Sequence, residues 1–234
     1  VTDHVISLSG DKALSAYTIH DAKAFRDALK ARGAAPTTIK RNFAVVRSIW
    51  NLSAREHGIN KPNPFGNMHY GTGAEPVKRL PVPIDSIRLV QNECMKLDDD
   101  IRWLIALISD TGMRLAEAAG LRISDLNLED EIPFVRLKEH ASRPLKTAAS
   151  RRDIPLVGSA LWAVQRATTK NDGPFLFPRY CSVNKCKADY ASNTLNKWMK
   201  PFVPDGCVIH SFRHSLRDRL RACECPSDII DQIG

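Results

Sequence analysis

The sequence lacks the marks of a membrane or exported protein. No stretch approaches the roughly 20 uninterrupted apolar residues that a membrane-spanning helix needs. The first residues, Val1 to His4, are not a basic segment followed by an apolar core, so they do not resemble a signal peptide. The chain opens on valine rather than methionine, which favours a fragment whose natural start is missing. We therefore expect a cytoplasmic protein with no membrane partner.

The cysteines lack the spacing of a zinc site. Cys181 and Cys186 have four residues between them, and Cys223 and Cys225 have one. Zinc sites usually combine two close pairs, or one cysteine pair with a histidine pair. A disulfide framework is also not expected in a chain this long without an export signal. We predict reduced thiols, no metal and no cofactor.

Charge of one sign dominates the sequence. The 234 residues carry a net charge of +8, and the isoelectric point is about 9.3. Lysines and arginines that neutralise phosphates release condensed counterions, so an excess of this size favours a polyanionic partner. Because many basic proteins bind no nucleic acid, the charge alone does not decide the function.

The chain begins with a small helical module. Apolar residues recur at helical spacing over 20–32 and again over 37–57, where Ile39, Phe43, Val46 and Trp50 form one stripe. Lys40, Arg41 and Arg47 lie off that stripe. They are either a solvated outer face or a surface that contacts DNA.

A segment rich in proline and glycine follows and predicts a linker. We assign residues 1–66 to a small helical domain, 67–82 to the linker and 83–234 to a larger domain. The larger domain is expected to be mainly helical with a small antiparallel sheet. Its predicted helices cover 84–97, 100–110, 114–119, 159–169, 191–202, 210–222 and 227–234, and its predicted strands cover 121–128, 133–138 and 151–156.

Two helix starts place cations where they could bind phosphate. Arg114 follows a glycine turn at the start of a short helix, whose free amides favour an anion. Glu117 lies three residues on, on the same helical face, where it could hold the guanidinium. His210 and Arg213 are also three residues apart at a helix start, and an imidazole beside a guanidinium suits phosphoryl transfer. The simpler readings are an exposed arginine–glutamate pair and a capping histidine beside a surface arginine.

A lysine at a hairpin turn is the next candidate. Lys146 falls in the predicted turn region 139–150. A lysine there is usually only a solvated side chain at the tip of a loop. It could also act as a mobile ammonium beside a phosphate or an alcohol leaving group.

Taken in order, these segments resemble the tyrosine recombinases, the family of phage integrases, Cre and the Xer proteins. Residues 111–121, TGMRLAEAAGL, are similar to the family's first arginine motif, and 145–156, LKTAASRRDIPL, to its lysine-bearing hairpin. Residues 210–214, HSFRH, are similar to the second arginine motif, and 229–234, IIDQIG, to the helix before the nucleophile. The first module, which ends in NPF, is similar to the family's core-binding domain.

The resemblance implies roles for the candidate residues. Arg114 and Arg213 would clamp the non-bridging oxygens of a scissile phosphate. Lys146 would protonate the departing 5′ oxygen, and His210 would assist as proton donor or acceptor. Glu117 would position the cations. The implied reaction is attack by a tyrosine, which gives a 3′-phosphotyrosyl link that the partner strand's 5′ hydroxyl then attacks, without ATP or metal.

The nucleophile of the family would follow the second arginine motif. The tyrosines of this sequence, Tyr17, Tyr70, Tyr180 and Tyr190, all precede His210. We therefore expect the nucleophile to lie beyond the last residue, and the 234 residues alone to be inactive in cleavage.

The implied partner is double-stranded DNA near the nucleoid, bound by a homotetramer on paired sites. His214 is expected to contact DNA together with Lys40, Arg41 and Arg47. The main alternative is a DNA-binding regulator or decayed integrase without strand-transfer chemistry. A type IB topoisomerase uses related chemistry but lacks this helical module. A metal-dependent nuclease would need an acidic cluster for two metals, which the sequence does not present.

Overall fold

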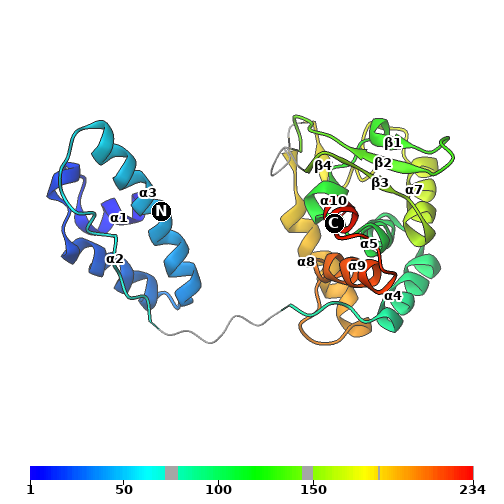
Figure 1. The fold of residues 1–234 in the computed structure, drawn as a ribbon, viewed down its shortest axis with the longest axis horizontal. Coiled ribbons are helices and arrows are strands. Elements are labelled where there is room, and N and C mark those ends of the chain that lie inside the picture. Colours follow the sequence, from blue (N-terminus) through cyan, green and yellow to red (C-terminus); the bar gives the residue numbers. More distant parts are fainter. Residues whose placement is uncertain (72–78, 144–149, 184, 234) are drawn as a thin grey trace. The chain divides into compact units, whose positions relative to one another are not determined.

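The computed structural model describes residues 1–71, 79–143, 150–183 and 185–233. The chain divides into two compact units, Val1–Pro76 and Val77–Gly234, both of which are drawn in Figure 1. None of the described helices is both long and apolar enough to cross a membrane.

The first unit is helical. Its elements are α1 (Thr2–Ser9), a 3-10 helix η1 (Leu14–Ala16), α2 (Ile19–Ala31) and α3 (Pro36–Glu56). The predicted stripe of α3 is confirmed, because Ile39, Phe43, Val46 and Trp50 are all buried. Helix α1 was not predicted, since it is eight residues long and buries only Val5, too little for a periodic signal.

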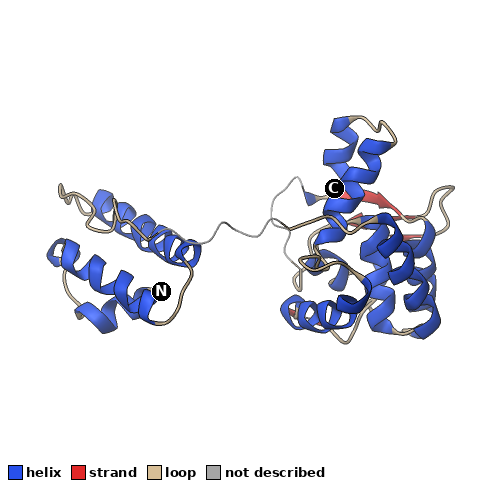
Figure 2. Ribbon diagram, turned by 90° about the horizontal axis from the view of Figure 1, so that it is seen from below, coloured by secondary structure: helices blue, strands red, loops and turns tan. Residues whose placement is uncertain are grey.

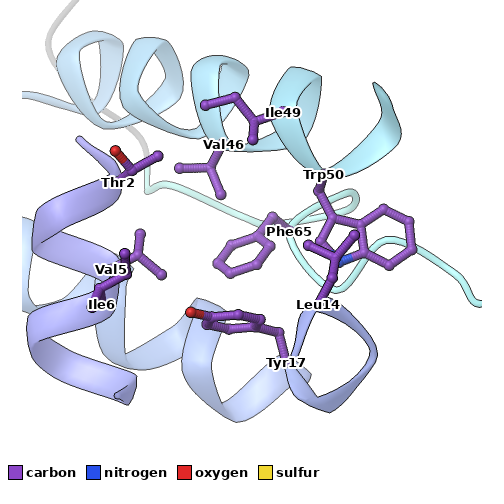
Figure 3. Close-up of a pocket in the computed structure, with 9 residues that line it drawn as sticks. All are labelled: Thr2, Val5, Ile6, Leu14, Tyr17, Val46, Ile49, Trp50 and Phe65. Carbon is purple, nitrogen blue, oxygen red and sulfur yellow. The ribbon is translucent and has the colours of Figure 1, made fainter. Parts of the chain in front are cut away.

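Aromatic rings fill the core of this unit. The ring centroids of Phe25 on α2 and Phe43 on α3 lie 5.2 Å apart, and Phe65 packs 6.2 Å from Phe43. Beside Phe65, an apolar cavity of about 110 Å³ opens between α1 and α3, with Val5 and Ile49 on opposite walls (Figure 3).

The second unit combines helices with small antiparallel sheets, as predicted. Its helices are α4 (Ile84–Leu97), α5 (Asp100–Thr111), α6 (Leu115–Ala119), α7 (Gly158–Lys170), α8 (Ala188–Met199), α9 (Ser211–Ala222) and α10 (Ser227–Ile233), with 3-10 helices η2 (Ile123–Asp125) and η4 (Lys200–Phe202). Its strands are β1 (Leu126–Asn127), β2 (Phe134–Leu137), β3 (Arg152–Pro155), β4 (Cys181–Ser182) and β5 (Lys185–Cys186). The first three form one antiparallel sheet in the order β1-β2-β3, and this sheet lies beside a mostly helical body (Figure 2).

Helix α5 is the centre of this unit. All residues from Trp103 to Ile108 are buried, because α4, α7 and α9 pack around the helix. Its end is therefore fixed in space, and the chain leaves it through Gly112, whose φ of +58° lies in the left-handed region that glycine tolerates.

The strand predicted over 121–128 is largely wrong. Only Leu126 and Asn127 are extended in a sheet, and the preceding residues form η2. The physical reason is Asp125, whose carboxylate accepts a hydrogen bond of 3.0 Å from the backbone N–H of Arg122 and closes a turn. An alternating pattern of apolar and polar residues does not reveal this local competition.

Candidate active site

The first arginine, Arg114, lies in the connection between α5 and α6. Arg114 has extended backbone angles and is the N-cap of α6. Its guanidinium Nη1 donates to Glu117 Oε1 at 2.8 Å, and its backbone N–H donates to Glu117 Oε2 at 3.0 Å. The contact expected from the three-residue spacing is therefore present. The Arg114 side chain keeps 36% of its surface exposed, so its remaining donors can reach an anion.

A second arginine holds the same carboxylate. Arg152 on β3 donates from Nη2 to Glu117 Oε2 at 2.9 Å, and the two side chains are only 5% and 6% exposed. Burial raises the pKa of the Glu117 carboxyl, but hydrogen bonds from Arg152 and Arg114 outweigh it and leave the pKa below its usual value. Glu117 is thus a buried carboxylate shared by two guanidiniums.

Arg152 also ties three segments together. Besides Glu117, its Nη1 donates to the carbonyl of Ser150 at 2.9 Å, and its Nε donates to the carbonyl of Ile233 at 3.1 Å. Helix α10 packs against β3, as Figure 1 shows. The last described turn of α10 is therefore anchored to the carboxylate that holds Arg114.

Arg152 was not among the residues predicted from the sequence, although its position in the strand contains a signal. Along the strand, Arg152, Ile154 and Leu156 are buried, whereas Asp153 and Pro155 between them are exposed. A period of two places Arg152 on the inward face with two apolar residues. An arginine on that face needs a buried anion, and the sequence offered Glu117.

The second arginine motif lies at the start of α9. His210 is the N-cap and Arg213 follows in the first turn. Arg213 Nη1 donates to the carbonyl of Gly112 at 3.1 Å, so it reaches the chain two residues before Arg114. The close approach depends on Gly112, because a Cβ there would lie 2.8 Å from Leu216 Cδ2.

The electrostatics place these cations in one neighbourhood. Burial, followed by the positive charges of Arg114 and Arg152, lowers the pKa of Arg213 to about 10. Burial also lowers the pKa of His210, and the nearby charges of His214, Arg213 and Arg114 lower it further. Crowded cations without a compensating anion destabilise one another, and a bound anion would relieve that repulsion.

A buried network of hydrogen bonds contacts the backbone of α6. Arg143, at 2% exposure, donates from Nη1 to the carbonyl of Glu117 at 3.1 Å and from Nη2 to Asp125 Oδ2 at 3.3 Å. His140 Nε2 lies 2.6 Å from Asp125 Oδ1. None of these three residues was predicted from the sequence, because each lies in a segment predicted as strand or turn, where nothing marks a polar side chain as buried.

The remaining predicted residues lie in different places. Lys146 falls within 144–149, outside the described residues. His214 is exposed, and its ring packs edge-on against His210 with centroids 5.4 Å apart. In the first unit, Lys40 and Arg41 are exposed on α3. Arg47 is half-buried, and its Nη1 donates to the carbonyl of Gly66 at 3.3 Å.

The arrangement is suited to holding a phosphate group. Arg114 and Arg213 can supply several N–H donors to non-bridging oxygens, and His210 can donate or accept a proton beside them. Among the described residues, no group of three or more histidine, cysteine, aspartate or glutamate side chains is placed to hold a metal ion.

Comparison with known proteins identifies relatives of this chain. The tyrosine recombinases XerC of Listeria welshimeri and Listeria monocytogenes are 28% and 27% identical to it over 154 residues, which cover 61% of this chain and 49% of each relative. The chain thus spans about half the length of the curated relatives it matches.

Solved structures share the fold. The Tn1549 transposon integrase in complex with circular intermediate DNA gives a TM-score of 0.70 at 19% identity, over 96% of this chain and 79% of that one. The lambda integrase of a tetramer bound to a Holliday junction gives 0.69 at 15% identity, over 99% of this chain and 67% of that one. The phage integrase family model matches residues 86–234, more than half of the sequence. The chain therefore belongs to the phage integrase family, the tyrosine recombinases.

Proposed function

We propose that this chain is the DNA-binding and phosphate-clamping part of a site-specific recombinase that breaks and rejoins DNA strands through a 3′-phosphotyrosyl intermediate. The observation that carries the proposal is the placement of Arg114, His210 and Arg213. They come from segments about a hundred residues apart, yet Arg213 donates to the carbonyl of Gly112, two residues before Arg114, and the charges of Arg114 and Arg213 both lower the pKa of His210. In a family of strand-transfer enzymes, such a cluster is best explained as a site for the scissile phosphate.

In the proposed mechanism each side chain has one task. Arg114 and Arg213 bind the non-bridging oxygens and stabilise the charge that develops in the pentacoordinate transition state. Burial lowers the pKa of His210 and favours its neutral imidazole in the free site, so it can accept a proton or share one with the phosphate. Glu117 positions Arg114, and Arg152 positions Glu117 in turn.

Lys146 completes the proposed set as the general acid that protonates the departing 5′ oxygen. The proposed partner is double-stranded DNA near the nucleoid, contacted by Lys40 and Arg41 of the first unit and by His214 of the second. The exposure of these three residues supports this assignment. Arg47 is bound to the carbonyl of Gly66, which favours a role in shaping the unit over a direct DNA contact. The assembly that acts on paired sites is proposed to be a homotetramer, and the reaction to need neither ATP nor metal.

The nucleophile is proposed to lie outside the 234 residues. Tyr180 is 1% exposed and buried in the core of the second unit, and Tyr17 and Tyr70 pack in the core of the first. Tyr190 is 64% exposed on α8, but it precedes His210 in sequence.

The direct test uses duplexes with candidate attachment sites from the DNA that flanks the gene. The full gene product should form a covalent protein–DNA adduct that resists denaturant, and the 234-residue chain should bind the same duplex without forming one. Arg114→Ala should abolish the adduct of the full protein, whereas Arg88→Ala, in an exposed pair on α4, should leave it intact. An adduct formed by the 234-residue chain would refute the placement of the nucleophile. Full activity of Arg114→Ala would refute the proposed site.

A further inference from the structure

Two cysteines that the proposed reaction does not use face each other across a small hairpin. Cys181 on β4 is opposite Cys186 on β5, and Ser182 is opposite Lys185. At the next pair along the two strands, away from the turn, the backbone N–H of Lys187 donates to the carbonyl of Tyr180 at 2.8 Å. Hydrogen-bonded and non-hydrogen-bonded pairs alternate along an antiparallel ladder. The cysteines therefore occupy a non-hydrogen-bonded pair.

This position suits a disulfide. In a non-hydrogen-bonded pair the Cα atoms are about 4.5 Å apart and the side chains approach each other closely. Disulfides span Cα separations of about 4.4–6.8 Å, so Cys181 and Cys186 can join without moving the backbone. Both are free thiols in the structure, and both are only half-buried, so a small reagent can reach them.

The surroundings distinguish the two thiols. The sulfur of Cys181 lies 3.1 Å from the carbonyl oxygen of Ala119, and its single S–H can be donated either to this oxygen or to the sulfur of Cys186. A hydrogen bond from Cys181, the charge of Arg143 and the backbone N–H of Ala188 all favour the thiolate of Cys186, and its pKa lies below the usual value. The same contact and burial raise the pKa of Cys181. Thiolates near an arginine and a helix N-terminus are the reactive form of cysteine.

We propose that Cys181 and Cys186 are a redox-active dithiol site, which closes into an intramolecular disulfide by exchange with a small disulfide of the glutathione type, with Cys186 as the attacking thiolate. Cys186 attacks one sulfur of the oxidant, forms a mixed disulfide and releases one thiolate. Cys181 then loses its proton and attacks the sulfur of Cys186, which expels the second thiolate. The chain loses two hydrogens, and one oxidised glutathione becomes two reduced glutathiones.

Formation of the disulfide would change contacts that the two cysteines make near α6. Cys181 loses the S–H that lies within reach of the carbonyl of Ala119, and the attraction between Arg143 and a negative charge on Cys186 is lost. Ala119 is the last residue of α6, and Arg143 holds the carbonyl of Glu117 in the same helix. The dithiol site is therefore adjacent to the helix whose N-cap is Arg114.

Peptide mapping can test the proposal on the whole chain. The reduced protein is incubated with oxidised glutathione, remaining thiols are alkylated, and the protein is digested with trypsin without reductant. Cleavage after Lys185 separates the two cysteines, so the peptide 180–185 stays joined to the dipeptide 186–187 only if the disulfide has formed. We expect this joined pair to accumulate. If both cysteines stay unjoined while exposed Cys223 takes up glutathione, the proposal is overturned.

Single variants identify the attacking thiol. Cys181→Ser should trap glutathione on Cys186, and Cys186→Ser should leave Cys181 unmodified over the same time. Serine keeps a donor for the carbonyl of Ala119, and urea unfolding of both variants checks that they fold. In the reduced wild-type chain, iodoacetamide should label Cys186 roughly tenfold faster than Cys181. Faster labelling of Cys181 would overturn the assignment of the attacking thiol.

Discussion

Replacing Arg152 by methionine removes one of the two cations that hold a buried carboxylate. Glu117 would keep Arg114 but lose the 2.9 Å contact from Arg152, and the carbonyls of Ser150 and Ile233 would lose donors. Breaking a buried ion pair by removing one partner costs about 3–5 kcal/mol, because the remaining charge loses a counterion in a medium of low polarity. We expect Arg152→Met to lower the free energy of unfolding by that amount.

The neighbouring pair Arg136–Asp153 is a matched control. It joins the adjacent strands β2 and β3 at 2.9 Å, but its side chains are 54% and 49% exposed. Exposed pairs contribute about 0.2–1 kcal/mol, so Arg136→Met should change stability by no more than that. The assay is urea unfolding followed by circular dichroism at neutral pH.

A second substitution separates charge from packing. Adding Glu117→Gln to Arg152→Met removes the buried charge that Arg152 no longer pairs, so the double variant should recover part of the lost stability. The pKa of Glu117 is below 4.5 in the folded chain, so its stabilising effect is present above that pH and is lost as the pH falls through the folded value. Arg152→Met should reduce this pH dependence. A loss no larger than that of Arg136→Met would refute the reasoning.

Other predictions concern protons, DNA contacts and the turn before Arg114. A bound phosphate favours the imidazolium of His210, whose pKa in the free chain is below 6.5. DNA binding should therefore take up a proton, and its affinity should rise as the pH falls towards 6.5. Calorimetry in buffers of different ionisation enthalpy should detect this proton uptake, and the uptake should vanish in His210→Gln. Lys40→Gln should reduce the salt slope of DNA binding by about 1 in fluorescence anisotropy, and an unchanged slope would remove this residue from the interface. Gly112→Ala should be less stable to heat than Gly33→Ala, because φ is positive at both but only at Gly112 would the Cβ meet a side chain, Leu216 Cδ2 at 2.8 Å.

The sequence predicted the elements with strong helical periodicity. Residues 84–97 form α4 with the predicted bounds, and the contact between Arg114 and Glu117 follows from their three-residue spacing, which joins the N-cap of α6 to its first turn. These features depend on interactions between residues close in the chain. A periodic pattern or a three-residue spacing therefore contains the information needed to predict them.

The contacts that build the site depend on residues far apart in sequence. The bond from Arg213 to the carbonyl of Gly112 and the bond from Arg152 to Glu117 join segments that only the packing of α5, α9 and β3 brings together. The resemblance to a family supplied the roles of Arg114 and Arg213, but not the buried partners behind them. Asp125 shows a different, local limit, because its carboxylate accepts a hydrogen bond from the backbone N–H of Arg122, three residues earlier, and forms a turn where a strand was predicted.

The central claim is that Arg114, Arg213 and His210 bind one phosphate-like anion together. The most direct measurement is a sulfate titration at constant ionic strength, followed by NMR of the arginine Nε–Hε groups and the histidine rings of the 234-residue chain. We predict that the signals of these three residues shift along one binding curve, while Arg88, exposed on α4, does not follow it. Separate curves for Arg114 and Arg213, or shifts no larger than that of Arg88, would contradict the claim.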